Sequence, residues 1–251
     1  KIKKIKKTFK KFKSALSNQL IQNLPYSLTN GQKKIINEIN KDLNSNLRMF
    51  RILQGDVGSG KTILAIIAAL NSIEAGYQCG LMAPTSILAE QHFKLLNELI
   101  LKSNLKIKIE LITGKVDAKK RKQILHNLKN NKIDFLVGTH ALFQKTISFY
   151  NLGLIIIDEQ HKFGVKQRIK FAKKGGVNCD VLLMSATPIP RTMMMSIYGD
   201  MDTSRLEEKP KYRQKILTLS KPENKIDELW PFIEKKIKNN EQIFWVCPLI
   251  E

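Results

Sequence analysis

A glycine-rich stretch at residues 54–62 constrains the fold of this chain more than any other feature. It has the sequence Gln-Gly-Asp-Val-Gly-Ser-Gly-Lys-Thr and fits the pattern G-x-x-x-x-G-K-[ST]. A strand-like apolar run, residues 49–53, precedes it, and a helix-like apolar run, residues 63–70, follows it. This order predicts a loop whose backbone N–H groups, with the positive end of the next helix, surround a polyphosphate. The alternative is a glycine-rich turn that binds nothing, and the agreement of strand, loop and helix disfavours it.

The loop supplies the residues that we expect to bind a nucleoside triphosphate. Lys61 would reach the β- and γ-phosphates, and the Thr62 hydroxyl would be a ligand of Mg²⁺. Glycines allow the tight backbone turn that such a loop needs. The nucleotide-binding residues predicted in the loop are Gly55, Asp56, Val57, Gly58, Ser59, Gly60, Lys61 and Thr62.

The charge of the chain favours a polyanionic partner. Lys and Arg number 43 and Asp and Glu number 22, which gives a net charge of +21 over 251 residues. The alternative is a lysine-rich composition spread over a solvated surface. Three cysteines lie far apart without a C-x-x-C pair, so neither a disulfide framework nor a zinc site is indicated. The apolar run after the loop is too short to span a bilayer and no signal peptide is present, so we expect a cytoplasmic protein without a membrane partner.

Changes in composition divide the chain into four parts. Residues 1–24 place apolar residues at spacings of three and four among lysines, which predicts a basic amphipathic helix. This helix could pack on the protein and offer its lysines to phosphates, lie on a membrane surface, or act as a solvated connector. Residues 25–206 form the main domain, 207–222 a linker, and 223–251 the opening of a second α/β domain. Because the chain lacks an initial Met and stops just after a strand-like run, we expect a piece of a longer protein.

Strand-like and helix-like segments alternate through the main domain. The predicted strands are 48–53, 78–83, 106–112, 133–138, 152–158 and 180–184, with a further one at 242–247. The predicted helices are 30–43, 62–75, 86–102, 118–130 and 165–173, with a further one at 224–238. Repeated strand-then-helix units with continuously apolar strands predict an α/β fold in which a parallel sheet is covered by helices on both faces.

An acidic pair follows one of the predicted buried strands. Residues 154–157 are apolar and lead into Asp158-Glu159-Gln160-His161. Open α/β sheets bind ligands at the carboxyl ends of their strands. Asp158 would therefore hold the Mg²⁺ that Thr62 touches, and Glu159 would orient and deprotonate the attacking water. The alternative is a loop that happens to be acidic. Together with the phosphate loop, the pair indicates hydrolysis, with Lys61, Asp158 and Glu159 as catalytic residues.

A third strand delivers a small polar loop to the same edge. Residues 181–184 lead into Ser185-Ala-Thr187, and two prolines follow within the next three residues. Small hydroxyl residues stiffened by prolines can hydrogen-bond the acidic motif and relay its state. A Ser-Ala-Thr sequence alone is weak evidence for a functional loop, but its position downstream of the acidic motif strengthens this interpretation.

The order of these three blocks resembles the first RecA-like motor domain of superfamily two helicases, which is a P-loop NTPase fold. The longer stretches 53–62, 158–168 and 184–192 resemble the RecG family of bacterial branched-DNA translocases. Segments 198–203 and 245–251 fit the same family. The transcription-repair coupling factor Mfd is the nearest alternative, because it shares the Phe-Gly-Val and Thr-Pro-Ile-Pro-Arg-Thr stretches. A Glu-Glu-Gln-like acidic motif would be expected in Mfd, whereas this chain has Glu-Gln-His.

The resemblance implies further roles at the nucleotide site. Gln32, in the stretch Leu-Thr-Asn-Gly-Gln, would contact the adenine edge, which makes ATP the expected nucleotide. The alternative is a surface glutamine that opens a helix. Gln160 and His161 would sense the γ-phosphate and couple it to nucleic-acid binding through Ser185 and Thr187.

The resemblance also implies contacts with nucleic acid. Loops after two strands would place hydroxyl and backbone N–H groups on successive phosphates of one strand. Ordinary strand-to-helix loops are the alternative, and one of the implied residues, Arg168, could equally form a structural salt bridge. The implied nucleic-acid-binding residues are Pro84, Thr85, Gly138, Thr139, His140 and Arg168.

The implied activity is that of a bacterial, cytoplasmic, monomeric ATP-driven motor on branched or forked DNA. In this family a second motor domain supplies arginine residues across the cleft, and a wedge domain splits the DNA. Both would be partners in the same full-length chain, so this segment alone should hydrolyse ATP poorly. An RNA helicase of the same superfamily, or a nucleotide-gated binding module without turnover, are the alternative functions.

Overall fold

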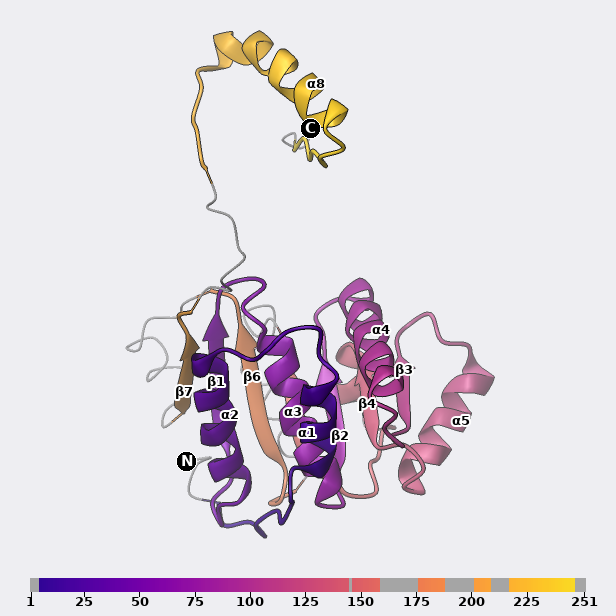
Figure 1. The fold of residues 1–251 in the computed structure, drawn as a ribbon. Helices are drawn as coiled ribbons and strands as arrows, with labels where there is room; N and C mark the ends of the chain where they lie inside the picture. Colours follow the sequence, from indigo (N-terminus) through magenta and orange to yellow (C-terminus); the bar gives the residue numbers. More distant parts are fainter. Residues whose placement is uncertain (1–4, 145, 159–175, 188–200, 209–216, 247–251) are drawn as a thin grey trace. The chain divides into compact units, whose positions relative to one another are not determined.

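The computed structural model describes residues 5–144, 146–158, 176–187, 201–208 and 217–246 (Figure 1). The chain divides into two compact units, Lys1–Pro210 and Lys211–Glu251, each of which is described by itself. The division falls inside the segment predicted as a linker, 207–222. Among the described residues, no helix is both long and apolar enough to cross a membrane.

A parallel sheet of seven strands forms the centre of the first unit (Figure 1). Its spatial order is β3-β4-β2-β5-β6-β1-β7, and every pair of neighbours is parallel. The strands are β1 (Phe50–Gly55), β2 (Gln78–Met82), β3 (Ile109–Ile112), β4 (Phe135–Gly138), β5 (Leu152–Ile157), β6 (Asp180–Ser185) and β7 (Asp202–Leu206). The predicted parallel α/β sheet is confirmed. Strand β7 was not predicted from the sequence.

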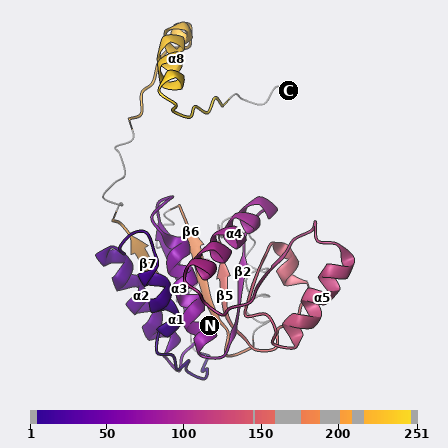
Figure 2. The same cartoon turned by 45° about the vertical axis from the view of Figure 1, so that its right-hand side comes forward.

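Helices cover both faces of this sheet. The helices of the first unit are α1 (Ala15–Gln22), α2 (Asn30–Leu43), α3 (Lys61–Glu74), α4 (Ser86–Lys102), α5 (Ala118–Lys129) and the short 3₁₀ helix η1 (His140–Phe143). Figures 1 and 2 show α1, α2 and α3 together on one face. Apolar residues of α1, α2, α3 and α4 form one core with this face of the sheet. Apolar residues of α5 and η1 belong to a second core with the opposite face. The helix predicted at 165–173 lies outside the described residues.

Alternation along the strands distributes their side chains between the two cores. In β5, Leu154 and Ile156 lie in the core beneath α1–α4, whereas Ile155 and Ile157 lie in the core beneath α5. Because both faces are covered, the strands are continuously apolar rather than alternating. Helix α3 is the most deeply placed helix, since every residue from Ile63 to Ser72 is buried.

Side-chain caps fix where several helices begin. Thr29 and Gln32 form a reciprocal capping box at the start of α2. Thr85 accepts a hydrogen bond from the backbone N–H of Leu88 and caps α4. The bounds predicted for these two helices, 30–43 and 86–102, agree with the structure.

The prediction of one basic helix over residues 1–24 is wrong for residues 5–14. These residues have no helical structure, and the helix α1 begins only at Ala15. The segment runs beside the residues that follow α2. The backbone N–H of Lys7 donates to Asn46 O at 2.8 Å, and that of Arg48 donates to Ile5 O at 3.0 Å.

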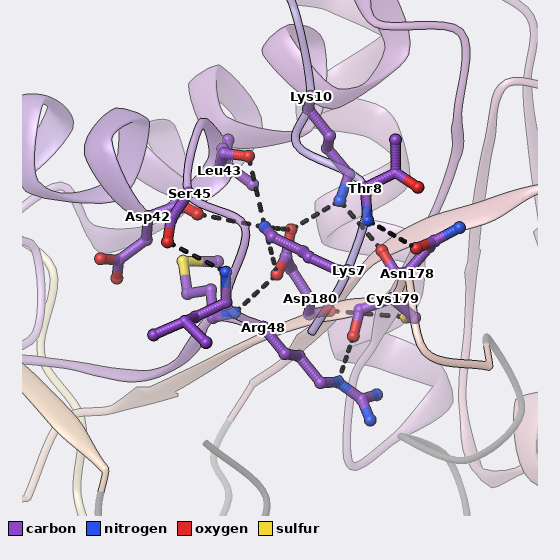
Figure 3. A network of polar contacts seen from close by, with 12 residues as sticks. Lys7, Thr8, Lys10, Asp42, Leu43, Ser45, Arg48, Asn178, Cys179 and Asp180 are labelled. Carbon is purple, nitrogen blue, oxygen red and sulfur yellow. Dashed lines mark hydrogen bonds and ion pairs between the residues drawn. The ribbon is translucent and has the colours of Figure 1, made fainter. Parts of the chain in front are cut away.

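Two lysines of this segment are buried on one carboxylate (Figure 3). The Nζ atoms of Lys7 and Lys10 both lie 2.6 Å from Oδ2 of Asp180, and all three side chains are fully buried. The backbone N–H of Met49 donates to the other oxygen of this carboxylate at 2.7 Å. Burial lowers the pKa of Lys7, and the charge of Asp180 opposes that effect. Two of the lysines that suggested an exposed helical face, Lys7 and Lys10, therefore belong to a buried ion cluster, whereas Lys6, Lys11 and Lys13 are exposed.

The described part of the second unit differs from the predicted secondary structure, while its assignment to a second α/β domain stays a prediction. Its described part contains a 3₁₀ segment, η3 (Glu223–Leu229), followed by α8 (Trp230–Lys238). The predicted helix at 224–238 is thus α-helical only in its second half. The predicted buried strand is wrong for residues 242–246, which have no regular structure and are exposed. The Trp230 and Trp245 rings stack with centroids 5.6 Å apart.

Candidate nucleotide site

Three of the predicted motifs lie at the carboxyl edge of the parallel sheet. The phosphate loop follows β1, Asp158 follows β5, and Ser185 ends β6. Strand β6 lies between the other two, and Gln54 of β1 is in register with Ser185. Parallel pairing brings these strand ends to one edge, which is where α/β sheets bind ligands.

The backbone of the phosphate loop requires its glycines. Gly58 and Gly60 have φ angles of 75° and 93°, which side-chain-bearing residues rarely adopt. A Cβ atom on Gly60 would also lie 2.5 Å from Nε2 of Gln32. At Gly55 a Cβ atom would lie 2.7 Å from the Ser59 hydroxyl oxygen. The glycines therefore permit both the turn and the close approach of neighbouring elements.

The polar groups of the loop fit a polyphosphate site. Lys61 donates from Nζ to the carbonyl oxygens of Gly55 at 2.7 Å and Asp56 at 2.9 Å, so its ammonium lies against the loop. Within the described residues, the buried Ser59 hydroxyl oxygen has no hydrogen-bond partner. Residues Asp56, Val57 and Gly58 are exposed at the tip of the loop. A buried hydroxyl without a partner is costly, so its presence beside glycines fits a loop shaped by function rather than by packing.

Gln32 connects helix α2 to this loop. Its Nε2 atom donates to Ser59 O at 2.9 Å, and its Oε1 atom accepts from the backbone N–H of Thr29 at 3.0 Å. The residue is only 6% exposed. The structure thus gives Gln32 a role that the sequence did not indicate, namely positioning the phosphate loop. The predicted adenine contact stays a prediction.

Glu208, two residues after β7, lies at the amino end of α2. The backbone N–H of Gly31 donates to its Oε2 atom at 3.0 Å. Hydrogen bonds from the Thr29 side chain and from Gly31 lower the pKa of this carboxyl. Sequence analysis placed residue 208 in a linker and missed this contact, because the strand that carries it there was not predicted.

Asp158 lies at the site with one carboxylate oxygen held by a histidine. The residue is 8% exposed, and its backbone N–H donates to Met82 O at 2.9 Å. Nε2 of His92, on α4, lies 2.7 Å from its Oδ2 atom. His92 was not predicted at the nucleotide site, because its partner Asp158 lies 66 residues away in the sequence, directly after β5.

The donor set is suitable for Mg²⁺. Thr62, the second residue of α3, offers a hydroxyl, and Asp158 offers a carboxylate. Magnesium in phosphoryl-transfer sites is usually held by one or two carboxylates together with phosphate oxygens, rather than by a full cage of side chains. Among the described residues, no group of three or more His, Cys, Asp or Glu residues could hold a metal ion. Oxygen ligands in small number therefore fit Mg²⁺ better than a transition metal.

The small polar loop after β6 is internally hydrogen-bonded. The Ser185 hydroxyl oxygen lies 3.0 Å from Thr187 O and 3.2 Å from Thr187 Oγ1. Ser185 is fully buried, whereas Thr187 is exposed. Both hydroxyls therefore take part in the internal hydrogen bonds of the loop, although Thr187 as a residue is exposed.

The predicted nucleic-acid-binding loops lie on the other half of the same edge. Pro84 and Thr85 follow β2, and Gly138 and Thr139 follow β4, which pairs with β2. A Cβ atom on Gly138 would lie 2.5 Å from the carbonyl oxygen of Ile112, so the strand ends are closely packed there. Thr85 and His140 are exposed.

Four predicted site residues lie outside the described residues. They are Glu159, Gln160, His161 and Arg168. Their predicted roles stay predictions.

Taken together, the parallel sheet, the glycine loop after β1 and the carboxylate after β5 define a P-loop nucleoside triphosphatase domain of the RecA-like type. The DEAD/DEAH box helicase family matches residues 29–196 of the chain. The chain belongs to this family.

Comparison with known relatives shows which members of this family the chain is similar to. The chain is 45% identical over 242 residues to the ATP-dependent DNA helicase RecG of Thermotoga maritima, covering 96% of this chain and 31% of that protein. It is 47% identical over 233 residues to RecG of Bacillus subtilis, covering 93% of this chain and 34% of that protein. A solved structure of RecG bound to a three-way DNA junction matches with a TM-score of 0.85 and 41% identity, covering 98% of this chain and 33% of that one. The resemblance to RecG is confirmed, and the chain spans about a third of these relatives.

Proposed function

We propose that the full-length protein is an ATP-dependent DNA helicase that remodels branched DNA, such as stalled replication forks and Holliday junctions, in recombination and repair. The observation that carries this proposal is the 45–47% identity to RecG helicases over more than nine-tenths of the chain. The geometry supports it, because the phosphate loop, Asp158 and Ser185 meet at one edge of the sheet.

The chemistry follows from the residues at that edge. Lys61 binds the phosphates, and Thr62 and Asp158 hold Mg²⁺. The metal, when bound, neutralises charge on the phosphate oxygens. Glu159 orients the attacking water and accepts its proton. Each role requires an oxygen or ammonium group at the carboxyl end of a strand or in the loop, and Lys61 and Asp158 are placed there.

Coupling to DNA involves the neighbouring loops. Gln160 and His161 sense the γ-phosphate, and Ser185 and Thr187 relay the change. The loops after β2 and β4 contact the phosphates of one DNA strand, as their place on the same edge allows. The residues proposed to contact DNA are Pro84, Thr85, Gly138, Thr139, His140 and Arg168.

The remaining partners belong to the parts of the protein that this chain does not include. A second motor domain would close over the nucleotide and a wedge domain would split the DNA, with the protein acting as a monomer in the bacterial cytoplasm. Residues 1–210 then need these parts for full turnover, since half of the hydrolytic cleft comes from the second motor domain.

Measuring ATP hydrolysis by the full-length protein with different nucleic acids tests this function. Forked or three-way DNA should stimulate hydrolysis more than linear duplex of equal length, and RNA should stimulate it least. Stronger stimulation by RNA than by DNA would favour an RNA helicase. Equal stimulation by branched and linear DNA would contradict branched DNA as the substrate. Nucleotide binding without phosphate release under all conditions would favour a binding module.

A further inference from the structure

His92 occupies a position on α4 that packing alone would give to an apolar residue. Ala89 and Leu96, three residues before and four residues after it, are buried on the same face of the helix. The His92 side chain is only 11% exposed. Nε2 of its imidazole lies 2.7 Å from the carboxylate of Asp158.

The direction of the hydrogen bond follows from the chemistry of the two groups. An ionised carboxylate can only accept, so Nε2 of His92 carries the hydrogen and donates it to Oδ2 at 2.7 Å. Both side chains are almost completely buried. A buried bond to a charged acceptor is stronger than a neutral one and strongly restricts the rotation of the carboxylate.

The bond joins two parts of the domain that have different proposed tasks. Asp158 follows β5 and is the proposed metal ligand. His92 lies on the helix that begins directly after Thr85, in the loop proposed to contact DNA. The backbone bond from Asp158 to Met82, the last residue of β2, ties the same two regions a second time. A movement of α4 would therefore be transmitted to the carboxylate.

A purely structural role for His92 would not explain why its partner is Asp158. A buried histidine needs a partner, and a backbone carbonyl would serve as well. Here the partner is Asp158, the carboxylate that follows β5 and that is proposed to hold the metal. Carboxylates that bind metals are commonly oriented by such second hydrogen bonds, and their loss lowers metal affinity by about 10- to 100-fold.

We propose that His92 is a positioning residue for Mg²⁺, which orients the Asp158 carboxylate and makes metal affinity depend on the loop and helix that contact DNA. This inference rests on the proposed function, because it assigns a regulator to the same site. It adds a residue from α4 to those at the strand ends, and it gives a physical route from the DNA contact to the nucleotide.

Two amide substitutions separate the hydrogen bond from the volume of the side chain. In His92→Gln the amide nitrogen takes a place similar to Nε2, whereas in His92→Asn it takes the place of Nδ1 and does not reach Asp158. The matched control is His126→Asn, since His126 is an exposed histidine on α5 whose Nε2 lies 3.0 Å from the side-chain nitrogen of Asn130. His92→Leu, which fills the space without a donor, serves as a second loss variant should His92→Asn fail to fold.

The measurement is the Mg²⁺ concentration that half-saturates binding of a fluorescent ADP by the full-length protein, with and without forked DNA. Because ADP binding needs no turnover, this readout is independent of activity. His92→Asn and His92→Leu should raise this concentration about tenfold and reduce its response to DNA, while His92→Gln stays within about threefold of the unsubstituted protein. In hydrolysis assays, saturating Mg²⁺ should restore kcat in His92→Asn.

Two results would overturn the proposal. One is an unchanged Mg²⁺ titration in His92→Asn and His92→Leu, and the other is an equal defect in His92→Gln and His92→Asn. Failure of this inference is distinguishable from failure of the proposed function. If branched DNA stimulates hydrolysis normally but the Mg²⁺ titrations of the His92 variants match that of the unsubstituted protein, only the role of His92 is lost. If the titrations differ as expected but no branched DNA stimulates hydrolysis, the proposed function is lost and the role of His92 remains.

Discussion

The side-chain amide of Gln32 donates a hydrogen bond to the backbone oxygen of Ser59, across 27 residues of sequence. The same amide accepts a hydrogen bond from the backbone of Thr29 and completes the cap of α2. One side chain thus fixes the start of a helix and the shape of the phosphate loop. These two tasks can be separated by substitution.

Gln32→Glu should weaken nucleotide binding while preserving the cap of α2. The glutamate keeps an oxygen that can accept from Thr29, but it places a second oxygen against the carbonyl of Ser59. We expect about a tenfold loss of ADP affinity, measured by fluorescence, and a loss of about 1–3 kcal/mol in the free energy of unfolding, because the buried Ser59 oxygen loses its donor. Thr29→Ala is the matched control, because it removes the cap at a cost of about 1 kcal/mol and leaves the bond to Ser59. Equal ADP affinity in the two variants would contradict this separation.

Gly60→Ala should destabilise the domain more than Gly76→Ala. Both glycines have positive φ angles, 93° and 85°, so both alanines incur the left-handed penalty of about 1–2 kcal/mol. Only at Gly60 would the new Cβ meet another group, Nε2 of Gln32, at 2.5 Å. Urea unfolding should show the larger loss for Gly60→Ala, and ADP affinity should fall only in that variant. Indistinguishable unfolding curves for Gly60→Ala and Gly76→Ala would show that the phosphate loop accommodates the new Cβ atom at no cost in stability.

Lys61→Ala and Glu159→Gln should each lower ATP hydrolysis by more than about 100-fold in the full-length protein. Lys61 is positioned on the loop, and a general base contributes rate enhancements of this order. Lys41→Ala, at an exposed lysine in the last turn of α2, should retain activity. Near-normal hydrolysis in Lys61→Ala or Glu159→Gln would contradict the catalytic role predicted for that residue.

Asp180→Asn should lower the free energy of unfolding by about 3–5 kcal/mol, because it leaves two buried ammonium groups without a carboxylate. Lys10→Met should cost less, since the pair between Lys7 and Asp180 remains. Glu90→Gln is a control on an exposed pair with Lys115 in the same unit, where the change should stay below about 1 kcal/mol. Chemical unfolding of the variants measures all three. Similar values for Asp180→Asn and Glu90→Gln would mean that the buried cluster does not stabilise the fold.

The buried thiols predict a loss of stability at high pH. Burial raises the pKa of Cys179 to about 12, and it raises the pKa of Cys79 as well. In the unfolded chain both thiols ionise near 9.0, so above this pH the unfolded state loses protons that the folded state keeps. The stabilising contribution is therefore complete below pH 9 and declines above it, by about 2 kcal/mol per thiol near pH 10.5.

Unfolding experiments across this pH range check the prediction. A variant with both Cys79→Ala and Cys179→Ala should lose less stability between pH 9 and pH 10.5 than the unsubstituted chain. Comparing slopes removes the contributions of lysines and tyrosines, which titrate equally in both. Parallel curves would show that the thiols ionise freely in the folded state.

The sequence predicted best what depends on local pattern. Helix α4 agrees at both ends because Thr85 caps it and its apolar spacing is regular. Strand β5 agrees to one residue because it is apolar throughout. Strand β7 was missed for the opposite reason. Asp202–Leu206 lies at the edge of the described sheet beside β1 and carries polar residues at its exposed positions.

Contacts between distant segments were beyond the sequence pattern. Lys7 and Lys10 looked like exposed positions because lysine is rarely buried without a partner, and their partner lies about 170 residues away. The resemblance grouped His92 with the loop after residue 83 that is implied to contact nucleic acid, and its bond to Asp158 was not predicted, although Asp158 itself was predicted at the site. Motif spacing thus located the phosphate loop and its carboxylate, whereas the side chains that hold them in place became visible only in the fold.

Residues 5–14 determine how far the first unit can be shortened from its amino end. A chain that began at Pro25 would keep every residue predicted to bind nucleotide, but it would remove α1 from α3 and leave Asp180 without its two cations. Since β6 runs from Asp180 to Ser185, the damage would fall on the central strand that ends at the candidate site. A shortened chain that keeps this unit stable must therefore retain residues 5–14, which lie well upstream of Gln32, the first residue predicted to bind nucleotide.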